Sequence, residues 1–529
     1  MSGRIAVDFG TSNTLIAIWD PSQRSSETCY IPEYCKRLTQ GSVTINLIPS
    51  LIHYATDNRQ WIGQQVIDRN LYQSERTFRW MKRYISNRTP MKIRLSDKEI
   101  TPAMAAEDFL NAVLVFSIRE IANENEEVAF SVPVEAFEHY EDWLSRLAER
   151  AGIRRYRLID EPSAAALGYG EHIQPGNVYL IFDFGGGTMH ASVVLIEPDT
   201  AATTGKRCRV LGKAGKDIGG TSIDQWIFQD VLKKNRRQDF EPEIRKLSTE
   251  LLVECEKLKE NLTCDETAEL SLSDPEKNTF LKSSYNRNEF EDLLEKNNLF
   301  TDINNTVRAA LNQAREKGYD EESVMSVLMV GGSSQIPAVQ KVLRQIFGRE
   351  KVKCDRPMDA VVRGAAVFVG GAEFFDHIQH NYSIRYLDPK TGVYKYQTIV
   401  PRGTIYPTQE PVTRLTLKAA FDGQTDLGIA IFEMSGAQKH AEPQFEMIFD
   451  PAGAARIMQV SAEQFEQRSM FWMNENAPTF ITASPPAKLG EPRFEVEFNV
   501  DQNKRLIITA RDRANGKFIF QEYPVIKLT

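Results

Sequence analysis

The chain has 529 residues, in which 64 Lys and Arg residues stand against 72 Asp and Glu residues, giving a net charge of -8. At roughly 150 residues per domain, this length predicts three or four structural units rather than one core. The acidic balance argues against nonspecific binding to nucleic acid or to anionic membranes. Apolar residues make up 42% and charged residues 26%, values typical of folded protein and not of disorder.

The six cysteines show no metal-binding or disulfide pattern. They fall at positions 29, 35, 208, 255, 264 and 354, without a Cys-x-x-Cys pair. No basic and apolar leader follows Met1, and no charge-free apolar run approaches the roughly 18 residues of a membrane span. We therefore expect a reduced protein of the cytoplasm, without a membrane partner.

A strand–turn–strand pattern occurs twice. Residues 5–18 read IAVDFGTSNTLIAI, and residues 178–196 read VYLIFDFGGGTMHASVVLI. The aspartates of the two turns, Asp8 and Asp183, are 175 positions apart (183 - 8), which is the length of one domain-sized unit. The interval predicts an internal repeat in which two similar lobes place their turns on either side of one cleft.

Helical patterns lie between and after these strands. They cover residues 102–121 and 137–151, and a short helix is expected over 163–167, after Glu161-Pro162. Apolar residues recur at three- and four-residue steps over 246–263, which predicts an amphipathic helix. Its adjoining polar face carries Glu256, Lys259 and Thr263.

The pattern changes after Gly370-Gly371. Apolar residues alternate over 415–421 and 427–431, on either side of an Asp422-Gly423 turn, and this predicts a hairpin. A second hairpin is predicted from 494–500 to 506–510. Residues from about 380 onward are therefore expected to be all-β, as two packed antiparallel sheets.

The two turns have the chemistry of a phosphate site. Gly10 and the triplet 185–187 allow backbone N–H groups to approach phosphate closely, and Asp8 and Asp183 suit a magnesium ion held through its waters. A single such turn is equally well explained as a solvated β-turn, but the duplicated context favours nucleotide binding. No Gly-x-x-x-x-Gly-Lys-[Ser/Thr] or Gly-x-Gly-x-x-Gly pattern occurs, so a P-loop and a dinucleotide fold are excluded.

Several ordered motifs resemble those of the actin-fold ATPases, most closely the seventy-kilodalton heat-shock chaperones of the DnaK type. The resemblance rests on residues 5–14 and 182–188 as two phosphate loops, 81–85 as the catalytic-lysine segment, 158–166 as the connecting glutamate motif, 256–263 as the adenosine-contacting helix and 330–337 as the adenosine loop. It implies an α/β actin-like ATPase domain of two ribonuclease-H-like lobes, about residues 1–175 and 176–371. The linker would be 372–383, and an all-β sandwich for peptide binding would cover 384–529.

The resemblance implies roles for individual residues. Lys82 would approach the γ-phosphate and order the attacking water, Glu161 would hold magnesium-bound water, and Thr11 and Thr188 would contact phosphate. The implied catalytic set is Lys82, Glu161, Asp183 and Thr188. The implied contacts to ATP or ADP and Mg²⁺ are Asp8, Gly10, Thr11, Ser12, Asn13, Gly185, Gly186, Gly187, Gly219, Gly220, Glu256, Lys259, Thr263, Gly331, Gly332, Ser333 and Gln335. Without the motif context, Lys82 would read as part of a solvated basic helix face.

In the β domain the resemblance implies a groove for extended polypeptide, lined by Ile384 and Leu387, although residue by residue both fit a sandwich core equally well. The family's helical lid has no counterpart in 384–529, so a lidless relative is expected. Unfolded polypeptides, a J-domain cochaperone and a nucleotide-exchange factor are the implied partners.

Four positions depart from the family pattern. His190 stands where the family has an acid near the metal, Gln335 replaces an arginine that stacks on adenine, Met358 replaces another acid, and Asn13 replaces an aromatic residue. We expect ATP binding with slow hydrolysis, in a chaperone whose nucleotide state is coupled to its β domain.

A nucleotide-sensing regulator or exchange factor of a full-length chaperone is the alternative. An actin-like filament former would leave residues 380–529 unexplained, and a sugar kinase would need an acceptor-hydroxyl base that the sequence does not identify.

Overall fold

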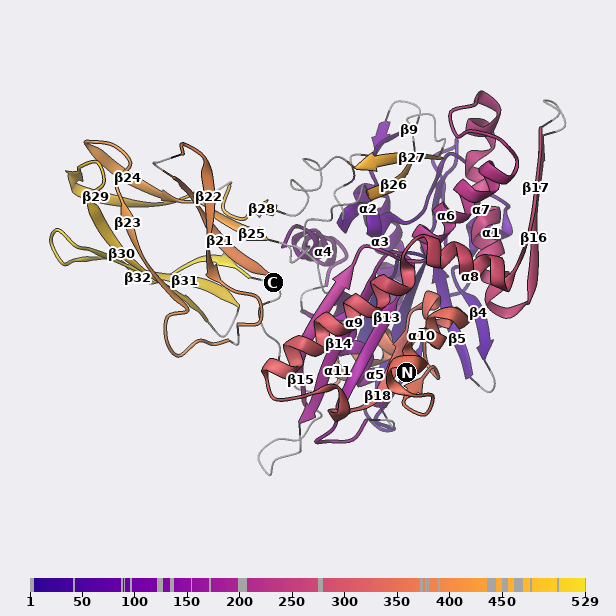
Figure 1. Ribbon diagram of the computed structural model, residues 1–529, viewed down its shortest axis with the longest axis horizontal. Helices are drawn as coiled ribbons and strands as arrows, with labels where there is room; N and C mark the ends of the chain where they lie inside the picture. Colours follow the sequence, from indigo (N-terminus) through magenta and orange to yellow (C-terminus); the bar gives the residue numbers. More distant parts are fainter. Residues whose placement is uncertain are drawn as a thin grey trace. The chain divides into compact units, whose positions relative to one another are not determined.

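The computed structural model describes residues 4–40, 43–86, 89, 91–95, 98–120, 127–133, 138–153, 155–170, 173–197, 207–274, 279–371, 374–375, 378, 380–388, 391–404, 406–434, 444–449, 455–460, 470–475, 478–501 and 504–528 (Figure 1). The chain forms two compact units. The first contains residues 1–134, 143–375 and 444–460, and the second contains 135–142, 376–443 and 461–529.

The first unit contains a seven-stranded mixed sheet in the order β12-β11-β1-β2-β5-β4, with β3 paired to β2. Strand β1 is antiparallel to β2 and parallel to β11, which is parallel to β12. The side chains of β1 are largely buried on both faces, as expected for a sheet that helices cover on both sides. The strands are β1 (Ile5–Phe9), β2 (Asn13–Asp20), β3 (Ser25–Thr28), β4 (Lys36–Gln40), β5 (Val43–Pro49), β11 (Val128–Val132) and β12 (Tyr156–Asp160).

A six-stranded sheet in the same unit has the order β19-β18-β13-β14-β15-β20. Its centre repeats the topology of the first sheet, because β13 is antiparallel to β14 and parallel to β18, as β1 is to β2 and β11. The strands are β13 (Val178–Phe184), β14 (Met189–Glu197), β15 (Arg207–Lys216), β18 (Val324–Val330), β19 (Val352–Lys353) and β20 (Phe374–Phe375).

Two helices pack together between these sheets. They are α5 (Glu161–Gly168) and α11 (Ala360–Val369), and one apolar cluster joins them to residues of both sheets. Glycines allow their close approach, since a methyl group at Gly364 would lie 1.6 Å from the carbonyl oxygen of Ala164, and one at Gly168 1.8 Å from that of Ala360. This helix pair therefore connects the two sheets through a common core.

The outer faces of the sheets carry other helices. The Phe9 ring contacts Phe109 of α3 (Pro102–Glu120) and Trp143 of α4 (Glu138–Arg150), while α9 (Leu299–Glu316) packs on β14 and β15. The remaining helices are α1 (Gln64–Asp68), α2 (Met81–Ser86), α6 (Gly220–Lys234), α7 (Pro242–Cys264), α8 (Arg287–Lys296), α10 (Pro337–Phe347) and the 3-10 turns η3 (Glu321–Ser323) and η4 (Gly332–Gln335). The expected helices over 102–121, 137–151, 163–167 and 246–263 are confirmed as α3, α4, α5 and α7. None of the described helices is long and apolar enough to cross a membrane.

Small sheets complete the first unit. They comprise β6 (Ile52–Tyr54), β7 (Gln60–Ile62) and β8 (Thr77–Phe78), β9 (Ile93–Leu95) with β10 (Lys98–Ile100), β16 (Thr267–Asp274) with β17 (Thr279–Asn286), and β26 (Gln444–Phe449) with β27 (Ala455–Val460). The last pair belongs to the first unit although the chain on both sides of it belongs to the second, and β27 lies against α7.

The described part of the second unit beyond residue 380 consists of strands. Four-stranded antiparallel sheets have the orders β22-β21-β25-β28 and β23-β30-β31-β32, and β24 pairs with β29. A single apolar cluster unites them. The strands are β21 (Asn381–Leu387), β22 (Tyr394–Val400), β23 (Thr413–Lys418), β24 (Gln424–Ile429), β25 (Ile431–Met434), β28 (Met470–Trp472), β29 (Thr479–Ala487), β30 (Pro492–Val500), β31 (Arg505–Asp512) and β32 (Phe518–Lys527).

One of the two expected hairpins is wrong. The strands around Asp422-Gly423 do not pair with each other, because β23 pairs with β30 and β24 pairs with β29. Leu417 lies opposite Phe494, and Leu427 lies opposite Ile481, so each strand buries its apolar side chains beside a partner distant in sequence. The alternation was read correctly, but alternation does not specify the partner. The hairpin of 494–500 with 506–510 is confirmed as β30 and β31.

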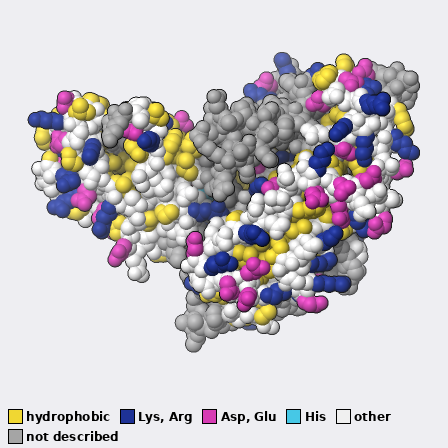
Figure 2. All heavy atoms as spheres, viewed as in Figure 1, with side chains coloured by type: hydrophobic (Ala, Val, Ile, Leu, Met, Phe, Trp, Pro, Cys, Tyr) yellow, Lys and Arg dark blue, Asp and Glu magenta, His cyan; other side chains and the backbone are white. Residues whose placement is uncertain are grey.

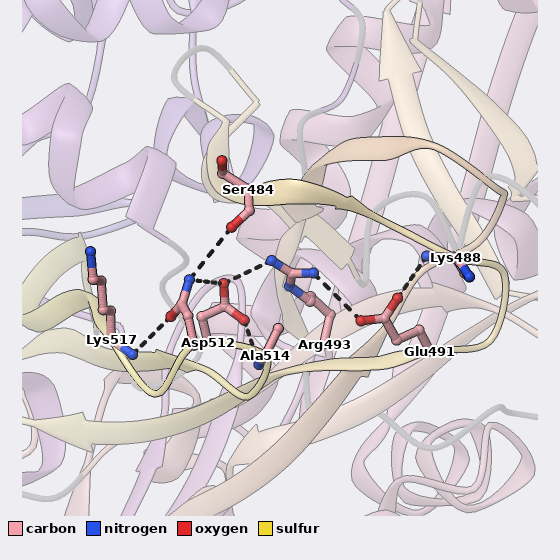
Figure 3. A network of polar contacts seen from close by, with 8 residues as sticks. Ser484, Lys488, Glu491, Arg493, Asp512, Ala514 and Lys517 are labelled. Atoms are coloured by element: carbon pink, nitrogen blue, oxygen red, sulfur yellow. Dashed lines mark hydrogen bonds and ion pairs between the residues drawn. The ribbon is translucent and has the colours of Figure 1, made fainter.

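A buried polar network stabilises the β30–β31 hairpin (Figure 3). Arg493 is 1% exposed, and its Nη2 lies 2.9 Å from Oδ2 of Asp512, which is equally buried. Its Nη1 lies 3.5 Å from Glu491. Asp512 also accepts hydrogen bonds from the backbone N–H of Ala514 and the side chain of Asn515. The charge pair is thus hydrogen-bonded on several sides, which a buried ion pair requires.

Candidate functional site

The two glycine turns contact each other. Gly10 lies between β1 and β2, and Gly185, Gly186 and Gly187 lie between β13 and β14. A methyl group added to Gly186 would lie 2.7 Å from Oγ of Ser12, and one added to Gly187 would lie 2.8 Å from Oγ1 of Thr11. The turns can approach this closely because Gly186 and Gly187 have no side chains.

A second layer of small residues surrounds the 185–187 turn. The N–H of Gly220 donates to the Gly185 carbonyl at 3.0 Å, and the hydroxyl of Ser333 donates to the same oxygen at 2.9 Å. A methyl group on Gly219 would lie 2.5 Å from the Gly186 carbonyl oxygen, and one on Gly331, whose φ is +83°, would lie 2.7 Å from Oδ1 of Asp183. The structure therefore brings together the glycine-rich positions that the sequence singled out.

Asp8 and Asp183 are the carboxylates that precede the two turns, and Asp183 is buried whereas Asp8 is half-buried. Burial raises the pKa of Asp8 to about 6, with Glu161 acting in the same direction, while Lys82 and the Ser131 hydroxyl, which donates to Asp8 at 2.6 Å, oppose the rise. Burial also raises the pKa of Asp183 well above its usual range, and the charges of Glu161 and Asp8 add to the effect. The carboxyl groups of Asp8, Asp183 and Glu161 thus all interact here with the cation of Lys82.

Lys82 and Glu161 form a buried ion pair between two helices. Lys82 is the second residue of α2, and Glu161 is the first residue of α5. Thr188 closes the second turn, where its carbonyl accepts from the Gly185 N–H at 3.0 Å. The Coulomb interactions of Lys82 and Glu161 with Asp8 and Asp183 place three of the four implied catalytic residues, all but Thr188, in one electrostatic cluster.

Asp160 fixes the start of α5 and was missed as a functional residue. Its Oδ1 accepts from the N–H of Ser163 at 3.0 Å and from the Ser163 hydroxyl at 2.7 Å, which is an N-cap. Its Oδ2 lies 3.2 Å from Nζ of Lys213 on β15. An Asp followed by Glu-Pro-Ser signals the cap in the sequence, but nothing in the sequence identifies Lys213 as its partner.

The expected adenosine helix, α7, faces other charged residues. Nζ of Lys259 lies 2.8 Å from Asp224 of α6 and donates to the Gly220 carbonyl at 3.3 Å. The hydroxyl of Tyr72 donates to Glu256. Burial raises the pKa of Asp224 to about 7, with Lys259 opposing and Glu256 adding to the rise.

Thr263 differs from its two neighbours on this face, because its hydroxyl donates to the Lys259 carbonyl of its own helix at 3.0 Å. Asp224 and Tyr72 were missed in the sequence. Asp224 follows Gly219-Gly220 by one helical turn, which is the only signal that could have indicated it.

The four residues that differ from the family pattern lie on the strands and turns that form this site or beside them. His190 is buried directly opposite Asp183 in the β13–β14 pair, and its ring contacts Gly215. The side-chain amide of Gln335 lies 3.5 Å from the Met358 sulfur, and a methyl group on Gly332 would lie 3.7 Å from that sulfur. Asn13 begins β2, and its carbonyl oxygen lies at the position that a Gly10 side chain would occupy.

The residues fit a magnesium-bound nucleotide. Two glycine turns in contact would supply backbone N–H groups for phosphate, and a divalent cation would favour the ionised form of the two carboxyl groups, whose pKa values burial raises. Asp8 and Asp183 are the residues that would hold the ion, and their hard oxygen ligands suit Mg²⁺.

The two positions expected to contact peptide lie in the second unit. Ile384 is buried in the apolar core of that unit, whereas Leu387, at the end of β21, is half exposed.

A family model described as "Hsp70 protein" matches residues 144–444, which is more than half of the chain. The matched range includes Glu161, the 185–187 turn, α7 and Gly331. The first glycine turn and Lys82 precede it.

Proposed function

The chain belongs to the Hsp70 protein family, and we propose that it is an ATP-dependent chaperone that hydrolyses ATP slowly and binds extended polypeptide through its C-terminal β unit. Family membership supports the chaperone and ATP-binding roles. The observation that carries the proposal for this chain is the direct contact between the turns at Gly10 and at 185–187, preceded by the half-buried Asp8 and the buried Asp183.

Hydrolysis is proposed to depend mainly on positioning. Lys82, held by Glu161, would order the attacking water and stabilise charge on the transferred phosphoryl group, and Thr11 and Thr188 would contact phosphate. A bound magnesium ion, held by Asp8 and Asp183 through water, would neutralise phosphate oxygens. The two-lobed form of the ATPase domain in 1–371 and the peptide-binding sandwich in 384–529 are parts of the same proposal.

Slow turnover is proposed because of His190. It lies opposite Asp183 in the sheet, where the resemblance predicts an acid, so one negative charge near the metal is missing. An imidazole carries no negative charge in either protonation state, so it does not replace a carboxylate in neutralising Mg²⁺. Gln335 and Met358, which contact each other, also differ from the family pattern. They would present an amide and a thioether to adenine where the family has an arginine and an acid.

Coupling between nucleotide and polypeptide is proposed to run through the segment around β20. Phe374 and Phe375 pair with β15 in parallel, and β15 also carries Lys213, the partner of Asp160. Because the linker segment contributes a strand to the six-stranded sheet, a change at the nucleotide site would reach the linker through that sheet. Such coupling is reciprocal, so polypeptide should change nucleotide affinity or turnover. We propose unfolded polypeptides, a J-domain cochaperone and a nucleotide-exchange factor as partners, in the cytoplasm.

The test is a paired measurement on the purified chain. ATP affinity and turnover are measured for wild type and for Lys82→Ala, each with and without an unfolded polypeptide. We expect slow, magnesium-dependent turnover that Lys82→Ala lowers by about a hundredfold or more while ATP still binds. Turnover unaffected by Lys82→Ala would reject the assigned mechanism, and a polypeptide without effect on nucleotide affinity or turnover would reject the coupling.

A second candidate is a nucleotide-sensing regulator or exchange factor of another chaperone. The His190–Asp183 juxtaposition favours it, because a site that binds nucleotide without efficient turnover suits a sensor. Such a protein would bind the chaperone but fail to keep an unfolded polypeptide from aggregating.

A further inference from the structure

One face of the sheet β22-β21-β25-β28 is lined by aromatic side chains around an arginine. The register places Arg385 opposite Tyr396, and Leu387 opposite Tyr394. It also places Ser383 opposite Phe432 and Phe432 opposite Trp472, so the face continues across all four strands. The alternate residues of β21, Tyr382 and Ile384, point into the apolar core instead.

The Arg385 guanidinium lies against three aromatic rings. Its central carbon is 4.7 Å from the ring centroid of Tyr394, 5.0 Å from that of Phe432 and 4.9 Å from that of Trp472. Phe432 and Trp472 are stacked at 5.7 Å, and Tyr396 meets Phe432 edge-on at 5.2 Å. These contacts hold the planar cation in place and shield it partly from water.

Three residues at one end of this face remain accessible, whereas Phe432 is 7% exposed. Tyr394 is 59% exposed, Leu387 50% and Tyr396 37%. Figure 2 shows hydrophobic side chains gathered on this part of the unit. Exposed aromatic rings beside an arginine are the residue types found most often at the centres of binding surfaces.

Among the described residues, no carboxylate forms an ion pair with Arg385. The acidic groups of the neighbouring strand segments have other partners, since Asp388 pairs with Lys395 at 2.6 Å and Glu433 accepts from Tyr382 on the core side. Among the residues that the structure describes, aromatic rings surround this half-buried guanidinium and no side chain accepts its hydrogen bonds, so its donors can serve an anion.

We propose that this face, formed by Arg385, Leu387, Tyr394, Tyr396, Phe432 and Trp472, binds an extended polypeptide through a side-chain carboxylate flanked by apolar residues. The carboxylate would accept hydrogen bonds from the Arg385 guanidinium, whose planar fork matches it. The apolar neighbours would rest on the two tyrosines and Leu387. The inference rests on the proposed polypeptide binding and adds a preference for acidic segments.

Strand β22 favours an extended segment over a single free acid. It is the edge of its sheet among the described strands, and residues 394–398 are exposed on both faces. An edge strand offers backbone N–H and C=O groups to a further strand, which gives affinity while side-chain contacts give specificity.

Fluorescence anisotropy on the full chain with labelled nine-residue peptides tests the proposal. Two acetylated and amidated peptides share an apolar sequence and differ only in a central Glu or Gln, and a third carries the Gln with a free C-terminal carboxylate. We expect the Glu peptide to bind wild type about tenfold more tightly than the Gln peptide, as for a hydrogen bond between charged groups. Arg385→Met, which keeps the apolar stem, should reduce this preference to within about twofold and leave the affinity for the Gln peptide nearly unchanged.

The matched control is Arg414→Met, an exposed arginine of β23 that pairs with Glu497 on the other four-stranded sheet. Arg414→Met should keep the preference for the Glu peptide. Arg385→Lys should keep part of that preference, so that a loss seen only in Arg385→Met is not confused with misfolding. A preference that survives Arg385→Met, or equal binding of the Glu and Gln peptides to wild type, would overturn the inference. An equal gain from the free C-terminus would identify a chain end, not a side chain, as the ligand and would overturn it too. If neither peptide binds wild type, the proposed polypeptide binding itself fails.

Discussion

Lys213 and Asp160 join the two large sheets of the first unit by an ion pair from which water is excluded. Nζ of Lys213, on β15, lies 3.2 Å from Oδ2 of Asp160, at the end of β12, and each side chain is at most 2% exposed. Asp160 precedes Glu161, the partner of Lys82. The pair therefore sets the position at which the α5 helix, and with it Glu161, begins.

We predict that Lys213→Met destabilises the first unit by about 3–5 kcal/mol, because it leaves the Asp160 charge buried without its cation. Asp160→Asn combined with Lys213→Met should recover most of this loss, since Asn also caps a helix and carries no charge. Hydrogen exchange of the β13–β15 amides in the full chain measures the change. Lys92→Met, which removes an exposed pair with Glu99, should change protection by less than about 1 kcal/mol. A double variant no more stable than Lys213→Met would contradict this account.

The contact between the glycine turns predicts a large effect from one methyl group. Gly187→Ala should lower ATP affinity by about tenfold or more, because its Cβ would lie 2.8 Å from Thr11 Oγ1 and force the turns apart. Lys92→Met, which removes an exposed ion pair with Glu99 and lies outside the positions assigned to nucleotide, should leave affinity within a few-fold of wild type. Equilibrium titration with a fluorescent ATP analogue compares the two, and equal losses would show that contact between the turns is not the cause.

Asp224 should make the stability of the first unit depend on pH. Its folded pKa, about 7, lies above the ordinary 3.8, so the folded state holds this proton more tightly than the unfolded state does. The resulting stabilisation is fully present below about pH 4 and is lost as pH rises to about 7, by at most about 1.4 kcal/mol per pH unit.

Asp224→Asn should remove this contribution. The difference in unfolding free energy between wild type and variant, measured by denaturation from pH 4 to 8, should change across the window and level off above it. A difference independent of pH would reject the raised pKa.

The buried Arg493–Asp512 pair predicts that substitution of Arg493 strongly destabilises the second unit. Arg493→Met should cost about 3–5 kcal/mol, because it leaves Asp512 buried without its cation. Arg414→Met, from an exposed pair, should cost less than about 1 kcal/mol. Hydrogen exchange of the β30 and β31 amides reports both, and similar losses would mean that burial does not determine the cost.

The sequence alone predicted those features that recur along the chain or depend only on neighbouring residues. The strand–turn–strand repeat led to both glycine turns, and helical periodicity led to α3, α4, α5 and α7. It was insufficient where the partner of a residue lies far along the chain. Tyr72 and Glu256 are 184 residues apart, and β23 pairs with β30 rather than with its neighbour β24, because alternation defines which face is buried but not which strand lies beside it.

The position of the β26–β27 hairpin determines how fragments of the chain should behave after proteolysis or separate expression. It is grouped with the first unit, beside α7, although the segments on both sides of it are grouped with the second. A fragment beginning near residue 380 therefore carries a piece of the first unit away from its neighbours, and the fragment that precedes it loses the strands that cover part of α7. A single proteolytic cut near residue 378 should yield two pieces that stay associated on a sizing column, and expression of either half alone would expose surface that the intact chain covers.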